Sequence, residues 1–139
     1  MARDGIHILI VEDNPADAKL MRRWLERATG VLSLQVAERG DLAVAELRRA
    51  SADGRAFDLV LLDANLPDMT GWEVIEAARR SAVSPTSQFL MLSGTCCDED
   101  VQQAQSLGLV GFELKPFDAE EFGRLVDRIS AFAAQSVRS

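Results

Sequence analysis

The sequence contains no run of about 18 apolar residues, the length that a helix needs to cross a membrane. Its first residues, Met1-Ala2-Arg3-Asp4-Gly5, also lack the apolar stretch of a secretory signal peptide. These two absences argue against a membrane protein and against an exported one. We therefore expect a cytoplasmic protein that does not have a membrane as a partner.

Cysteine is scarce, and basic residues are outnumbered by acidic ones. Cys96 and Cys97 are neighbours in the sequence, so a disulfide between them would be strained and would close no useful loop. We expect two free thiols. The 15 Lys and Arg residues stand against 22 Asp and Glu residues, and the net charge of -7 gives no general attraction to a phosphate backbone. Nucleic acid is therefore not an expected partner.

Apolar residues, by contrast, are numerous enough for one hydrophobic core. Of the 139 residues, 47% are hydrophobic and 27% are charged, which is typical of one globular domain. We predict a single domain over residues 1–139, with its core in about 5–134 and a short polar C-terminal tail.

Short apolar segments, partly β-branched, alternate with segments of helical periodicity. We expect strands at 6–11, 32–37, 59–62, 89–92 and 109–114. Apolar residues at helical spacing follow each of them. After the first two strands these residues are Leu20, Met21, Trp24, Leu25 and Ala28, and then Leu42, Val44, Ala45 and Leu47.

Polar residues and helix breakers indicate where these elements begin and end. Asn14 or Asp13, followed by Pro15, predicts the start of the first helix, and Asp98 can cap the fourth. A connection through Ser84-Pro85 precedes the fourth strand. Parallel strands need crossover connections, so the alternation predicts an α/β fold: a doubly wound, five-stranded parallel sheet with helices on both faces.

Polar side chains stand at the ends of four of these strands. Glu12 and Asp13 follow the first strand, Asp63 the third, Ser93 the fourth and Lys115 the fifth. The carboxyl ends of the strands share one edge of a doubly wound sheet, so these groups can meet there. Simpler roles are also open: Asp63 and Ser93 are common turn residues, and Lys115 could be a solvated loop charge.

The chemistry of this set favours phosphoryl transfer. Three carboxylates in one place repel one another, and a hard cation such as Mg²⁺ relieves the repulsion while keeping them ionised. One carboxylate can then attack phosphorus and form an aspartyl phosphate. A metal ion and one lysine supply the charge neutralisation that this reaction needs.

Four ordered motifs resemble the receiver domain of two-component response regulators. They are Val11-Glu12-Asp13, Leu62-Asp63-Ala64-Asn65-Leu66-Pro67-Asp68-Met69-Thr70-Gly71, Ser93-Gly94 and Lys115-Pro116-Phe117. The resemblance covers essentially the whole chain. It implies a flavodoxin-like fold with strand order 2-1-3-4-5, as in the chemotaxis regulators.

The resemblance also implies a role for each site residue. Asp63 would accept a phosphoryl group from a sensor histidine kinase or a histidine phosphotransfer protein. Mg²⁺ would be bound by the carboxylates of Asp13 and Asp63, by the backbone carbonyl of Asn65 and, through water, by Glu12. Lys115 would pair with the phosphoryl oxygens. Such a protein catalyses only its own phosphorylation and dephosphorylation, so we do not expect an enzyme.

Two further residues would form the switch that the resemblance implies. Ser93 would bond to the phosphoryl group and move toward it, and Phe112 would swing inward with it. The expected output is protein contact through the fourth helix, fifth strand and last helix, without a DNA-binding domain; a homodimer through the last helix is compatible with the sequence. Phe112 could instead be an ordinary core residue, and it lacks the hydroxyl group of tyrosine.

Two other functions fit the sequence less well. A phosphatase that forms an aspartyl phosphate usually has a second acid two residues after the nucleophile, and Asn65 stands there. A receiver-like scaffold that is never phosphorylated would not need Ser93 and Lys115 together with the acids. Both functions are therefore disfavoured.

Overall fold

The computed structural model of the chain describes residues 4–81 and 86–138. Within these ranges the chain forms five strands and five helices that alternate in sequence. The strands are β1 Ile6–Val11, β2 Val31–Ala37, β3 Leu59–Asp63, β4 Gln88–Ser93 and β5 Gly111–Leu114. The helices are α1 Pro15–Leu25, α2 Gly40–Ala52, α3 Gly71–Arg80, α4 Asp98–Ser106 and α5 Ala119–Arg138. The expected connection through Ser84-Pro85 lies outside the described residues.

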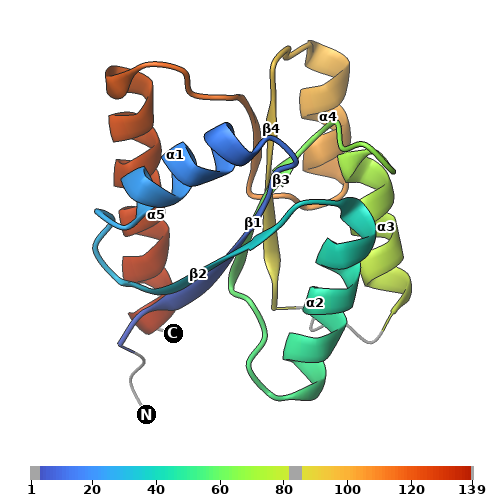
Figure 1. Cartoon of the computed structure of the whole chain (residues 1–139), viewed down its shortest axis with the longest axis horizontal. Coiled ribbons are helices and arrows are strands. Elements are labelled where there is room, and N and C mark those ends of the chain that lie inside the picture. The colour runs from blue at the N-terminus through green and yellow to red at the C-terminus, as the bar shows by residue number, and fades with distance from the viewer. Residues whose placement is uncertain (1–3, 82–85, 139) are drawn as a thin grey trace.

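All neighbouring strands are parallel, in the order β2-β1-β3-β4-β5. Helices α1 and α5 cover one face of the sheet, and α2, α3 and α4 cover the other (Figure 1). This arrangement confirms the doubly wound, flavodoxin-like fold that was predicted. None of the helices in the described part of the chain is long and apolar enough to span a membrane.

Each face of the sheet carries its own hydrophobic core. In β1, Leu9 and Val11 point into the core beneath α2, α3 and α4, whereas Ile8 and Ile10 point into the core beneath α1 and α5. Because side chains alternate across a strand, a strand that is covered on both faces needs apolar residues at nearly every position. This requirement explains the continuous apolar runs in the sequence.

An expected capping residue is observed at the start of α1, but not at the start of α4. Asn14 caps α1, since its Oδ1 accepts hydrogen bonds from the backbone N–H groups of Ala16 at 2.9 Å and Asp17 at 3.1 Å. The prediction for α4 was wrong by one residue: Cys97 occupies the N-cap position, and Asp98 is the first helical residue. Cys97 and its neighbour Cys96 are exposed free thiols, as predicted.

The predicted apolar stripes of α1 and α2 were partly wrong. Leu20 is 40% exposed and Leu42 is 48% exposed, although both were placed in these stripes. The buried faces instead pass through small residues such as Ala18 and Ala43, which let each helix approach the sheet closely. The last helix also continues to Arg138 and does not fade near residue 136.

Candidate functional site

The ends of β1, β3 and β5 bring three charged side chains into direct contact. The Nζ atom of Lys115 lies 2.8 Å from Oε1 of Glu12 and 2.8 Å from Oδ2 of Asp63. These residues are far apart in the sequence, and the parallel sheet places them at one edge. The predicted meeting of acids and lysine at this edge is therefore seen in the structure.

Asp13 completes a group of three carboxylates. One oxygen from each of Glu12, Asp13 and Asp63 lies within 4.8 Å of the others. Glu12 and Asp63 are buried, with exposed fractions of 2% and 6%, whereas Asp13 is exposed to solvent. Three carboxylates and one ammonium leave the group with a net negative charge, which a divalent cation would offset. Carboxylate oxygens are the ligands that Mg²⁺ prefers, so the residues fit this metal.

The loop after β3 folds back tightly on Asp63. The backbone N–H of Asn65 donates to Oδ1 of Asp63 at 3.1 Å, and that of Gly71 donates to the carbonyl of Ala64 at 2.8 Å. A Cβ atom at position 71 would lie only 3.0 Å from the backbone oxygen of Asp63. Such a contact is tighter than most Cβ contacts, so glycine favours this close approach of the start of α3 to the end of β3.

Burial and hydrogen bonding shift the pKa values of two members of the group. Burial raises the pKa of Glu12, although hydrogen bonds from Lys115 and from the Asn14 N–H oppose the shift. Burial also acts to lower the pKa of Lys115, but its hydrogen bonds with Asp63 and Glu12 outweigh that effect and raise the pKa. Lys115 therefore remains a cation that is held between two carboxylates.

Ser93 ends β4, which pairs with β3, and Phe112 lies on β5, which pairs with β4. Ser93 is 4% exposed, its hydroxyl oxygen accepts a hydrogen bond from the N–H of Thr95 at 3.3 Å, and its carbonyl accepts one from the N–H of Lys115 at 2.8 Å. Phe112 does not line the acidic group. It is buried in the core under α3 and α4, where its ring is stacked on that of Trp72.

Two residues make contacts near this site that the sequence does not predict. The carboxylate of Asp68 accepts hydrogen bonds from the N–H groups of Gly40 and Asp41, at the start of α2. The ring of Trp72 in α3 is stacked on that of Phe112 in β5. Neither contact follows a local pattern, because each joins segments that are distant in the sequence.

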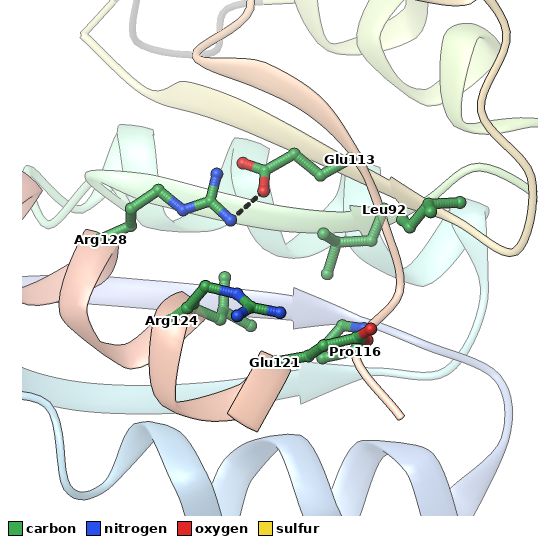
Figure 2. A pocket seen from close by; sticks show the side chains of 8 residues that line it. Leu92, Glu113, Pro116, Glu121, Arg124 and Arg128 are labelled. Carbon is green, nitrogen blue, oxygen red and sulfur yellow. Dashed lines mark ion pairs between the residues drawn. The ribbon is translucent and has the colours of Figure 1, made fainter. Parts of the chain in front are cut away.

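A cavity of about 200 Å³ lies apart from the acidic group, between β5 and α5. Figure 2 shows Glu113 of β5 paired with Arg128 of α5 across it, with Arg124 and Glu121 nearby. Its lining includes none of Glu12, Asp13, Asp63 and Lys115. The cavity is therefore separate from the acidic group at the edge of the sheet.

Comparison with known proteins identifies one family over most of the chain. A family model described as "Response regulator receiver domain" matches residues 8–127. The probable methanogenesis regulatory protein FilR2 of Methanothrix harundinacea is 32% identical over 132 residues, which cover 94% of this chain and 85% of that protein. The two-component response regulator ORR41 of Oryza sativa is 33% identical over 123 residues, covering 88% and 93%.

Other relatives are longer, and the similarity extends to solved structures. The cell cycle response regulator CtrA of Brucella ovis is 31% identical, but the matched region spans 51% of its length. Chemotaxis protein CheY4 of Vibrio cholerae is 28% identical with a TM-score of 0.70, covering 90% of this chain and 98% of that one. The CheX–CheY–BeF3–Mg complex of Borrelia burgdorferi matches with a TM-score of 0.73 at 20% identity, covering 91% and 88%, and shows the shared fold.

These matches agree with the geometry of the site. The group formed by Glu12, Asp13 and Asp63 is typical of a receiver Mg²⁺ site, and receiver domains act with histidine kinases or phosphotransfer proteins as signalling phosphoacceptors. The phosphatase alternative is thereby removed. The chain belongs to the response regulator receiver domain family of two-component signalling.

Proposed function

We propose that Asp63 is the residue that accepts the phosphoryl group. The observation that carries this proposal is the contact between Oδ2 of Asp63 and Nζ of Lys115, at 2.8 Å, within a group that also holds Glu12 and Asp13. In the transfer, an oxygen of Asp63 forms a bond to phosphorus, while the bond between phosphorus and the histidine nitrogen of the donor breaks. A sensor histidine kinase or a histidine phosphotransfer protein is the donor.

The neighbouring residues have separate tasks in this reaction. Mg²⁺ would be held by the carboxylates of Asp13 and Asp63 and by the backbone carbonyl of Asn65, and Glu12 would reach it through water. When it is bound, the metal ion offsets negative charge on the carboxylates and on the incoming phosphoryl group. Lys115, which pairs with Asp63 in the unphosphorylated protein, moves its charge to a phosphoryl oxygen.

The output of the reaction is a change in the surface formed by α4, β5 and α5. Ser93 approaches the phosphoryl group and draws the β4–α4 loop with it, and Phe112 follows. Val110, just before β5, and Leu114, at its end, are 49% and 58% exposed. Both are available for contact with a partner protein. Self-association through α5 would use the same surface.

Beryllofluoride, which imitates an acyl phosphate, tests the proposal directly. With Mg²⁺ present, the wild-type protein is expected to bind it, as measured by ¹⁹F NMR of the bound fluorides. Asp63→Asn removes the ligand oxygen and is expected to abolish binding. Asp53→Asn, which changes an exposed acid at the far end of α2, is the matched control and is expected to bind normally.

Two results would contradict the proposal. Binding that persists in Asp63→Asn would place the acceptor at another residue. A wild-type protein that binds no beryllofluoride at any Mg²⁺ concentration would instead favour the scaffold that is never phosphorylated.

A further inference from the structure

The aromatic residue of the proposed switch is stacked on a tryptophan from another helix. The rings of Phe112 in β5 and Trp72 in α3 have centroids 5.7 Å apart and an angle of 5° between their planes. Phe112 is 8% exposed, and Trp72 is half-buried over it. The separation and angle are those of a favourable offset stack between aromatic side chains.

Trp72 stands on a backbone that is fixed to the acceptor strand. It follows Gly71, whose N–H donates to the carbonyl of Ala64, the residue after Asp63. A Cβ atom at position 71 would lie only 3.0 Å from the backbone oxygen of Asp63, so the two segments are in close contact. The first turn of α3 is held further by the reciprocal hydrogen bonds between Thr70 and Glu73. Trp72 therefore has little freedom to follow Phe112 if that ring moves.

We propose that Trp72 is a positioning residue for the switch, which holds the ring of Phe112 in its resting place. The inference rests on the proposed function, because it assumes that Phe112 changes position when Asp63 is phosphorylated. It adds a residue of α3 to a switch that was otherwise confined to β4, α4, β5 and α5. It also gives a second structural route from Asp63 to Phe112, through Gly71 and Trp72, beside the one through Ser93.

Because Phe112 has no polar group, its ring needs a packing partner such as Trp72 to fix its position. A tyrosine at this position could exchange one hydrogen bond for another as it turns, but Phe112 has no hydroxyl group, and only packing determines where its ring lies. A contact that exists only in the resting state lowers the fraction of molecules that are competent for the phosphorylated state. Its removal must raise the apparent affinity for any ligand that selects that state.

A second stack of the same kind supplies a matched control. Trp24 of α1 and Phe122 of α5 have ring centroids 5.6 Å apart and an interplanar angle of 11°. This pair lies in the core on the opposite face of the sheet. A substitution there removes a comparable contact without touching β5 or α3.

The decisive experiment measures beryllofluoride affinity by ¹⁹F NMR at a fixed Mg²⁺ concentration. Trp72→Leu is expected to bind roughly two- to tenfold more tightly than the wild type, which is the range that one aromatic pair supports. Trp72→Phe, which keeps an aromatic ring, is expected to stay near the wild-type affinity. Trp24→Leu is expected to leave the affinity unchanged.

The two proposals fail in different ways. If wild-type protein binds beryllofluoride but Trp72→Leu has the same or a weaker affinity, the inference about Trp72 is wrong and the proposed function stands. If the wild type does not bind, the proposed function itself is wrong.

A second measurement is independent of whether Trp72→Leu folds. In Trp24→Phe, Trp72 is the only remaining tryptophan. Addition of beryllofluoride and Mg²⁺ is expected to shift its fluorescence emission, because Phe112 leaves its face. The further change Phe112→Leu is expected to remove most of that shift while binding persists. A shift of equal size with and without Phe112 would overturn the inference.

Discussion

Lys115 and a metal ion would compete for the same oxygens. The Nζ atom of this residue lies 2.8 Å from an oxygen of Glu12 and from an oxygen of Asp63, and both of these carboxylates are buried. The ammonium group therefore neutralises part of the charge that would otherwise attract Mg²⁺. A divalent and a monovalent cation about 4 Å apart repel by about 8 kcal/mol at an effective dielectric constant near 20, and solvent reduces this value because Lys115 is 27% exposed.

Substitution of Lys115 by alanine is accordingly expected to strengthen Mg²⁺ binding, by roughly tenfold, which corresponds to about 1.4 kcal/mol of relieved repulsion. Phosphoryl transfer from a small donor such as acetyl phosphate is expected to fall, since the cation proposed to pair with the phosphoryl oxygens is lost. Isothermal titration with MgCl₂ measures the first effect. Lys19→Ala, which changes the other lysine of the chain, is the control. Weaker Mg²⁺ binding in Lys115→Ala would mean that the lysine mainly orders the carboxylates.

At the scale of elements, the loop that follows Asp63 also starts α2, which is distant in the sequence. Arg39 stands at the N-cap position of α2 and makes no capping hydrogen bond with its side chain. Asp68, in the loop between β3 and α3, supplies that cap from outside, accepting from the N–H groups of Gly40 and Asp41 at 2.9 Å each. The side chain of Met69 packs so closely on Gly40 that a Cβ atom at position 40 would overlap it. The loop and α2 are therefore held together as one unit.

Asp68→Ala is expected to lower the free energy of unfolding by about 1 kcal/mol, the usual effect of losing an N-cap. Denaturation by urea near neutral pH measures the change. Asp53→Ala removes an acid from the other end of α2, where its pair with Arg49 is exposed, and is expected to change the stability by less than about 0.5 kcal/mol. Equal losses in the free energy of unfolding would show that the cap from Asp68 stabilises the protein no more than the exposed acid Asp53 does.

The effect of Asp68 is also expected to depend on pH. Burial acts to raise the pKa of the Asp68 carboxyl, but the hydrogen bonds from the N–H groups of Gly40 and Asp41 outweigh that effect and lower the pKa. Because the pKa is lower in the folded state, the stabilisation is complete above the unfolded pKa, near 4, and is lost as the pH falls through the folded value. The stability difference between wild type and Asp68→Ala should therefore close on acidification. A difference that persists in acid would mean that the carboxyl caps α2 equally well when neutral.

At the scale of the whole molecule, the sequence was sufficient for the fold and for the edge where the polar residues meet. Strands buried on both faces leave continuous apolar runs, and the residues that end them, such as Asp63 and Lys115, can be located from those runs. Contacts between segments that are distant in the sequence leave no such pattern. The cap from Asp68 to α2 and the stack of Trp72 on Phe112 are of this kind. Leu20 was misplaced for a related reason, since helical spacing does not show how closely a helix approaches its sheet.

The acidic site is expected to couple the stability of the whole domain to Mg²⁺. A ligand that binds only the folded state, at ten times its dissociation constant, stabilises that state by about 1.4 kcal/mol. For a domain of this size the midpoint of thermal unfolding should rise by roughly 4–6 °C. Calorimetry with and without MgCl₂ measures the rise. NaCl at the same ionic strength is the control, because the net charge of -7 makes general screening stabilising as well.

Asp13 separates metal binding from folding in this measurement. It is the exposed member of the carboxylate group, so Asp13→Asn is expected to fold with nearly the wild-type stability when Mg²⁺ is absent. The rise in the midpoint of thermal unfolding that Mg²⁺ produces should then fall to the level of the NaCl control, because a carboxylate ligand has been lost. If Mg²⁺ stabilised Asp13→Asn and the wild type equally, the ion would bind somewhere other than the site formed by Glu12, Asp13 and Asp63.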